Sequence, residues 1–235
     1  MDETSAGDTA FGISISLAFV GGYADAASFL LANTFTGHLT GNCILAAVSA
    51  ASQEWYLAAD RLLAVAVFLV GIVCSLTLSR FIPVTLRRYS LAIAIFIEVL
   101  LILSACLFLA NRANHEPFIV CICLALGIQN DALRKTNGFS VHSTYMTGMV
   151  TTLTQKSFQH FFSPRGPEPD SAKHSAGAAI QVLAPMWTSF LSGALAGALM
   201  VASFHSAGLL GIGLLLIVLI YAEIKTVTLV SHSNR

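Results

Sequence analysis

The sequence predicts an all-α fold, a polytopic bundle of transmembrane helices whose chain is two copies of one smaller unit. Of its 235 residues, 56% are hydrophobic and only 10% are charged, whereas a soluble domain carries about 25% charged residues. The charges gather in short intervals between long apolar stretches, which is the distribution that a bilayer enforces. One block of sequence also occurs twice, in corresponding places of two hydrophobic halves. Together these three observations predict an integral membrane protein with an internal repeat.

The charge and cysteine content argue against several other classes of protein. The chain has 12 basic and 12 acidic residues, so no excess of positive charge indicates a nucleic-acid partner. The N-terminus carries Asp2, Glu3 and Asp8 in place of the basic region that starts a cleavable signal peptide. The five cysteines lie in or beside apolar segments, and their spacing fits neither a disulfide framework nor a zinc site. No nucleotide, haem or flavin motif is present, so we expect no cofactor.

Six stretches are candidates to cross a bilayer core, which takes about 20 residues. They are Phe11–Leu31, Leu62–Ser79, Leu91–Ala110, Pro117–Arg134, Ala178–Phe204 and Ala207–Ala222. The loop after the second contains Arg80, Arg87 and Arg88 and no acid, so the positive-inside rule places it in the cytoplasm. Counting from that loop places both termini inside, the Asn33–Asp60 connection outside and the Lys135–Ser175 connection inside.

The internal repeat is carried by two blocks of sequence. The first reads G-G-Y-A-D-A-A-S-F-L-L-A-N-T-F-T-G-H-L-T-G-N over residues 21–42, and the second reads G-I-Q-N-D-A-L-R-K-T-N-G-F-S-V-H-S-T-Y-M-T-G-M over 127–149. The matches are Gly21 with Gly127, Asp25-Ala26 with Asp131-Ala132 and, after one inserted residue, Thr40-Gly41 with Thr147-Gly148. Three matches in the same order in two hydrophobic halves indicate a duplication.

The number of spans in each half decides whether this duplication is inverted. Three full spans in each half make the two halves run in opposite directions, as in many secondary transporters. If the short stretches Cys43–Ser52 and Val150–Phe161 cross fully, each half has four spans and the repeat is parallel. We favour short broken or re-entrant helices, because Cys43–Ser52 has about half the length that a crossing needs. The expected parts are a tail over 1–9, repeats over 10–112 and 113–228 with a cytoplasmic linker around 162–177, and a tail over 229–235.

The two blocks also resemble a known family. G-x-x-x-D-A leading to T-G-H-L-T-G-N, and G-I-Q-N leading to T-Y-M-T-G, resemble the bacterial YoaK family of transmembrane proteins over nearly the whole chain. The resemblance implies a location in the bacterial inner membrane and a multi-span fold, and no established activity. Asp131 stands where the family pattern has an alanine, and Met149 replaces the asparagine of the second T-G-N. We therefore expect the second half to bind differently from the first.

Three carboxylates lie at membrane depth, where an ionisable group is costly and suggests a function. Asp25 lies past the middle of the first span, and its repeat mate Asp131 lies near the end of the fourth. Asp25 fits a proton or cation site as well as a structural ion pair. For Asp131 the structural interpretation is favoured, because Arg134 and Lys135 follow within about one turn. Glu98 has no basic residue within a turn and is a candidate proton-linked group, with pairing across the bundle as the alternative.

The two Thr-Gly segments form the other candidate site. They are Thr40, Gly41 and Asn42 in the first block and Thr147 and Gly148 in the second, and Gln129 and Asn130 of the second block add donors and acceptors to the site. The segments precede short apolar stretches and have N-cap character. A half-helix that begins inside the membrane points free N–H groups and its positive dipole end inward, which predicts a polar site near a pseudo-twofold axis. The alternative is a structural crossing in which broken helices satisfy one another's backbones. His38 and His142 flank these segments, and their spacing predicts no metal site.

These features favour a transporter or channel for a small polar solute or ion, with the lipid bilayer as its surroundings. The alternative is a non-catalytic membrane scaffold or sensor. Gly193 and Gly197 form a small-x-x-x-small ridge that suits helix packing within the chain or in a homo-oligomer. An intramembrane enzyme is less favoured, because the motifs of intramembrane aspartyl and rhomboid proteases are absent.

Overall fold

The computed structural model describes residues 3–110, 115–132, 146–162 and 170–233, and within them all regular secondary structure is helical. The helices are α1 (Glu3–Ala32), α2 (Leu39–Ala51), α3 (Trp55–Phe81), α4 (Ser90–Ala110), α5 (His115–Ala132), α6 (Met146–Phe162), α7 (Asp170–Phe204) and α8 (Leu210–Ser233). Two 3-10 helices, η1 (Val84–Tyr89) and η2 (His205–Leu209), precede α4 and α8. The all-α prediction is confirmed.

Several of these helices are long and apolar enough to cross a membrane. The qualifying stretches are Phe11–Ala32, Trp55–Phe81, Val84–Ala110 and Ser175–Thr228, the last of which takes in most of α7 and α8. α2 is a shorter apolar helix. The predicted fourth span, Pro117–Arg134, falls on α5, which is not among the qualifying stretches. The last two residues of this predicted span lie outside the described ranges.

Large apolar side chains cover the outside of the bundle as well as filling its core. Leu17 and Phe68 are almost completely buried, whereas Leu69, Phe96 and Leu214 are 49%, 54% and 69% exposed. Monomeric soluble proteins rarely expose contiguous apolar surface on this scale. The exposed apolar surface and the long apolar helices together indicate a multi-pass membrane protein.

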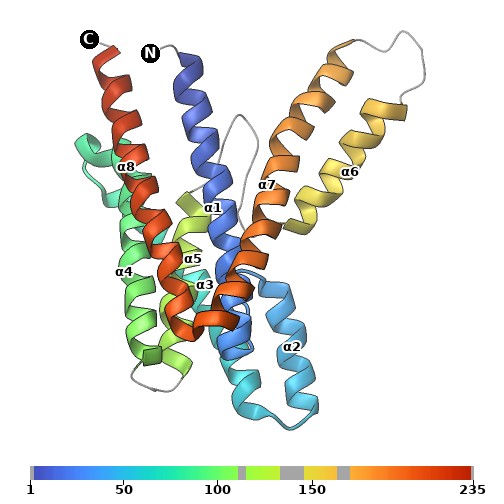
Figure 1. Ribbon diagram of the computed structural model, residues 1–235, viewed down its shortest axis with the longest axis vertical. Coiled ribbons are helices and arrows are strands. Elements are labelled where there is room, and N and C mark those ends of the chain that lie inside the picture. Colours follow the sequence, from blue (N-terminus) through green and yellow to red (C-terminus); the bar gives the residue numbers. More distant parts are fainter. Residues whose placement is uncertain (1–2, 111–114, 133–145, 163–169, 234–235) are drawn as a thin grey trace.

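Figure 1 shows how the helices run. α1 and α2 point the same way, and so do α5 and α6, but the first pair runs opposite to the second. The described ends of the chain, at the start of α1 and the end of α8, lie at one end of the bundle (Figure 1), together with η1 and its Arg87 and Arg88. The turn between α2 and α3 lies at the opposite end, as does η2.

Glycines allow the two most extensive helix contacts, which are α1 on α7 and α3 on α5. A Cβ atom at Gly193 of α7 would lie 2.1 Å from the carbonyl oxygen of Phe19 in α1. One at Gly127 of α5 would lie 2.3 Å from the carbonyl oxygen of Phe68 in α3. Gly197 also faces α1. The predicted ridge therefore packs within the chain, and a homo-oligomer through it stays a prediction.

Candidate functional site

The connection between α1 and α2 is held by hydrogen bonds to one buried carboxylate. Asp25 lies in α1 and is only 4% exposed. Its Oδ1 accepts hydrogen bonds from the backbone N–H groups of Thr36 and Gly37, at 2.9 Å and 2.7 Å, and from the Thr36 hydroxyl at 2.9 Å. Both residues belong to the connection between the two helices. Asp25 therefore fastens this connection to α1 through charge-assisted bonds, which are stronger than neutral ones.

The other carboxylate oxygen of Asp25 contacts His38. The distance from His38 Nδ1 to Asp25 Oδ2 is 2.6 Å, and this nitrogen must carry the hydrogen because an ionised carboxylate only accepts. The His38 side chain stays 35% exposed, and its ring lies 5.8 Å from that of Phe190 in α7. The hydrogen bond to Asp25 raises the pKa of His38 above its ordinary 6.5, and partial burial of the ring offsets only some of this effect.

Asn42 of α2 holds the same connection from the other side. Its side chain is completely buried. Its Oδ1 accepts a hydrogen bond from the Phe35 N–H at 3.0 Å, and its Nδ2 donates to the Phe35 carbonyl oxygen at 2.8 Å. The Phe35 ring stacks on Phe29 of α1, with 4.6 Å between the ring centroids. Both ends of the Asn42 amide are thus engaged by the protein backbone.

The Thr-Gly segments lie inside the first turns of α2 and α6, at Thr40 and Gly41 and at Thr147 and Gly148. The prediction that they cap these helices is wrong for the first block. α2 begins at Leu39, and its N-cap residue is His38, which makes no side-chain capping bond. The Asp25 carboxylate accepts from N–H groups just before the helix, and Thr40 lies inside its first turn.

Arg61 is a further buried polar residue of the first half that sequence reasoning missed. It lies near the start of α3 and is 7% exposed. Its Nε donates to the Asn33 carbonyl oxygen at 3.2 Å, and one terminal nitrogen donates to the Leu45 carbonyl oxygen at 2.7 Å and to the Ser49 hydroxyl at 2.6 Å. Arg61 thereby joins the end of α1 to α2 and α3. The signal in the sequence was its place directly before the long apolar run of the predicted Leu62–Ser79 span.

The second half places its polar residues on the last turns of α5. Gln129 is 1% exposed, and its Nε2 donates to the Leu17 carbonyl oxygen in α1 at 3.1 Å. The Gln129 Oε1 is buried and has no hydrogen-bond partner among the described residues. Asn130 and Asp131 are each 8% exposed. A buried amide oxygen such as the Gln129 Oε1 is costly without a hydrogen-bond donor.

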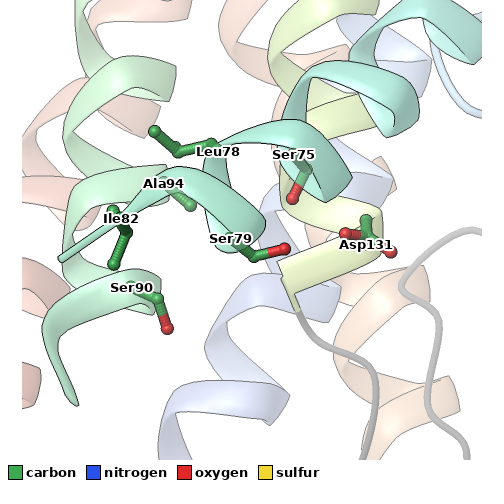
Figure 2. A pocket seen from close by; sticks show the side chains of 7 residues that line it. All are labelled: Ser75, Leu78, Ser79, Ile82, Ser90, Ala94 and Asp131. Carbon is green, nitrogen blue, oxygen red and sulfur yellow. The ribbon is translucent and has the colours of Figure 1, made fainter. Parts of the chain in front are cut away.

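Asp131 lines a cavity of about 160 Å³ at the meeting point of α3, α4 and α5. Its lining residues are Ser75, Leu78, Ser79, Ile82, Ser90, Ala94 and Asp131. Figure 2 shows the hydroxyl groups of Ser75 and Ser79 on the side of the cavity nearest to the Asp131 carboxylate. The polar part of the lining consists of oxygen atoms from one carboxyl and three hydroxyl groups. These groups can accept hydrogen bonds from a polar solute or approach a small cation.

Glu98 of α4 is the most deeply buried charged residue of the described chain. Its exposed fraction is 0%. Neither of its carboxyl oxygens has a hydrogen-bond partner among the described residues. An ionised carboxylate in such surroundings is strongly disfavoured. The pairing across the bundle that the sequence left open as an alternative is not formed within the described part of the chain.

The structure places the predicted site residues in two groups. Asp25 and Asn42 hold the α1–α2 connection, and Gln129, Asn130 and Asp131 lie in the last turn of α5, where Asp131 lines the serine-lined cavity. The second Thr-Gly segment lies on α6, which packs against α7. Arg134, Lys135 and His142 fall outside the described residues, so their expected roles stay predictions.

The comparisons with known proteins give a family and nothing closer. A family model described as a protein of unknown function (DUF1275) matches residues 13–222, so the chain belongs to this family. The resemblance to YoaK proteins is thereby confirmed. No curated protein and no solved structure matches the chain.

Proposed function

We propose that this member of the DUF1275 family is a transporter or channel for a small polar solute or ion, built as an inverted repeat. The observation that carries the proposal is the cavity beside one of the two repeat-related carboxylates. Asp25 accepts hydrogen bonds from its own helix connection, and its repeat mate Asp131 lines a cavity with Ser75 and Ser79. In this proposal the connection between α1 and α2 is the rigid part of the site. The cavity at Asp131 is the part that contacts the solute.

The directions and contacts of the helices support the inverted repeat. The pair α1 and α2 runs opposite to the pair α5 and α6 (Figure 1). If α1 corresponds to α5 and α3 to α7, the two most extensive contacts, α1 on α7 and α5 on α3, are equivalent. The contacts of α2 on α3 and of α6 on α7 are equivalent in the same way. Secondary transporters of this plan bind their substrates at interrupted helices between the repeats.

Glu98 supports a proton-linked step. A completely buried carboxyl group without a hydrogen-bond partner is best accommodated in its neutral form. Such a group binds a proton when it is enclosed and releases it when water or a cation reaches it. We therefore assign Glu98 as the proton-carrying group and Asp131 as the group that contacts the solute.

The orientation follows from the charged end of the bundle. We place both termini in the cytoplasm of a bacterial inner membrane, because the described ends of the chain lie at the same end of the bundle as Arg87 and Arg88 (Figure 1). Loops on the cytoplasmic side carry the excess of arginine and lysine.

The test is a thermal-unfolding screen of the purified protein against inorganic ions and small polar metabolites at two pH values. A ligand at about 100 times its Kd stabilises the folded state by about 2.7 kcal/mol, which is a measurable shift. We expect a compound or ion that shifts the unfolding of the wild type and of Ser104→Ala, and shifts that of Asp131→Asn and Ser75→Ala much less. Ser104 is the matched control, because its hydroxyl is exposed and bonds only within α4. A screen without any hit at either pH contradicts the proposal.

A further inference from the structure

A second cavity lies on the outer face of the bundle, between α4 and α8. It encloses about 410 Å³ and is lined by Tyr89, Ala92, Ile93, Phe96, Ile220 and Ile224. Tyr89 ends η1, and Ala92, Ile93 and Phe96 of α4 follow it by three, four and seven residues, so these side chains lie on one face of the η1–α4 stretch. From Tyr89 to Phe96 this face rises by about 10 Å. The cavity is therefore an apolar groove about two turns long, on a surface that faces the hydrocarbon of the bilayer.

One end of this groove is positively charged. Arg87 and Arg88 of η1 are exposed, and the guanidinium carbon of Arg88 lies 4.9 Å from the ring centroid of Tyr89, which begins the groove. The sequence from Arg80 to Ile97 contains no acidic residue. On α8, the exposed Lys225 follows Ile224, and Glu223 is the one acid nearby on that helix.

We propose that this groove binds an anionic phospholipid, with an acyl chain along α4 and α8 and the phosphate at Arg87 and Arg88. The order of the groups matches such a lipid, because Arg87 and Arg88 lie in η1, at the first turns of the Val84–Ala110 span, and the apolar lining follows them along α4. Basic clusters at the cytoplasmic end of transmembrane helices attract anionic headgroups, whereas a zwitterionic headgroup has no net charge to offer them. The site is separate from the cavity at Asp131 and does not depend on the proposed transport function.

Native mass spectrometry of the purified protein tests the proposal. The probes are phosphatidylglycerol and phosphatidylcholine with identical acyl chains, added at the same concentrations. We expect phosphatidylglycerol to bind more tightly to the wild type. Each arginine near an anionic headgroup contributes roughly a fivefold change in affinity, so Arg87→Gln with Arg88→Gln should weaken phosphatidylglycerol binding by about 25-fold and leave phosphatidylcholine binding unchanged. Lys156→Gln on α6, which removes one positive charge at a distant site, is the control and should bind like the wild type.

Two further variants keep the test decisive if the double glutamine variant unfolds. Arg87→Lys with Arg88→Lys keeps both charges and should retain the preference for phosphatidylglycerol. Ile93→Trp fills the groove while leaving the arginines in place, and it should reduce the binding of both lipids. Equal binding of the two lipids to the wild type would overturn the proposal. Effective competition by glycerol phosphate, which has no acyl chain, would overturn it as well, because the groove would then be unused.

Discussion

Among single residues, Asp25 makes the most hydrogen bonds to the connection between α1 and α2. Its carboxylate accepts from two backbone N–H groups, one hydroxyl and one histidine ring, and all of them belong to residues 36–38. Asp25→Asn removes the charge and replaces one acceptor oxygen by an NH2 group, so the bonds from Thr36 and Gly37 become weaker neutral bonds and the bond from His38 Nδ1 is lost. We expect a loss of about 3 kcal/mol in the free energy of unfolding. Thermal unfolding of the purified variant measures this loss.

Glu116→Gln is the matched control for Asp25→Asn. Glu116 is an exposed acid near the start of α5, and its replacement should change the stability by less than about 0.5 kcal/mol. An Asp25→Asn protein that is as stable as Glu116→Gln would show that the carboxylate does not fasten the connection. From the sequence, Asn42 was a candidate binding residue, and Asp25 fitted a proton or cation site as well as a structural ion pair. Their satisfied hydrogen bonds make a stabilising role the stronger expectation.

The pair of His38 and Asp25 makes stability depend on pH. The pKa of folded His38 is raised above 6.5 by its hydrogen bond to Asp25. A raised pKa means that the stabilisation is fully present below about pH 6.5 and is lost as the pH rises through the folded value. The wild type should therefore lose stability relative to His38→Gln between pH 6.5 and more alkaline pH. A difference between the two proteins that stays constant with pH, in parallel thermal melts, would contradict this coupling.

Sequence reasoning found several important side chains but not their partners. Asp25 and Glu98 stood out because charged groups are rare in apolar spans. The partners of Asp25 could not be predicted, because they depend on the reversal of the chain at Asn33, which adopts a φ of 52°. The serines around Asp131 could not be predicted for a related reason. Ser75 and Ser79 lie on α3, far along the chain from Asp131, and only the packing of α3 on α5 brings them together.

At the scale of helices, close approach between α1 and α7 depends on glycine. A Cβ at Gly22 of α1 would lie 2.0 Å from the Phe190 carbonyl oxygen, whereas nothing lies within 4 Å of one at Gly12 of the same helix. Gly22→Ala should therefore destabilise the protein by about 3 kcal/mol through overpacking. Gly12→Ala should be neutral or stabilise it by up to about 1 kcal/mol, because alanine favours the helix. Equal unfolding temperatures for the two variants would contradict the observed contact.

The helices themselves were largely predictable from hydropathy, and their exact ends were not. The long apolar stretches reappear in α1, α3, α4, α7 and α8, because a bilayer demands continuous apolar helices. The start of α2 was placed too late, since Thr40 reads as an N-cap in isolation. The structure begins this helix at Leu39, directly after a connection whose N–H groups bond to Asp25 of α1.

For the whole molecule, the arrangement of charged ends predicts its orientation. In Figure 1 the turn between α2 and α3 lies opposite to η1. In a cysteine-free background, Gln53→Cys should react with a membrane-impermeant maleimide added to intact cells, and Arg88→Cys should react only after the membrane is opened. Both positions are exposed, so accessibility alone does not separate them. The reverse pattern of labelling would contradict cytoplasmic termini.

The repeat was visible in the sequence, but the different surroundings of its two matched carboxylates were not. Asp25 and Asp131 match without a gap, yet one carboxylate fastens a connection and the other lines a cavity. The sequence hinted at a difference only through the departures at Asp131 and Met149. Which carboxylate lines a cavity depends on side chains contributed by other helices, and a comparison of two short blocks does not contain them.

The most direct measurement is uptake into proteoliposomes of the solute or ion that stabilises the purified protein in the screen. We predict uptake by the wild type and by Ser104→Ala, together with a loss of at least about tenfold in Asp131→Asn, because the cavity oxygen atoms meet the solute. A transport site at the Asp131 cavity would be contradicted by either of two results. One is uptake by the wild type no faster than by protein-free liposomes, and the other is equal uptake by the wild type and Asp131→Asn.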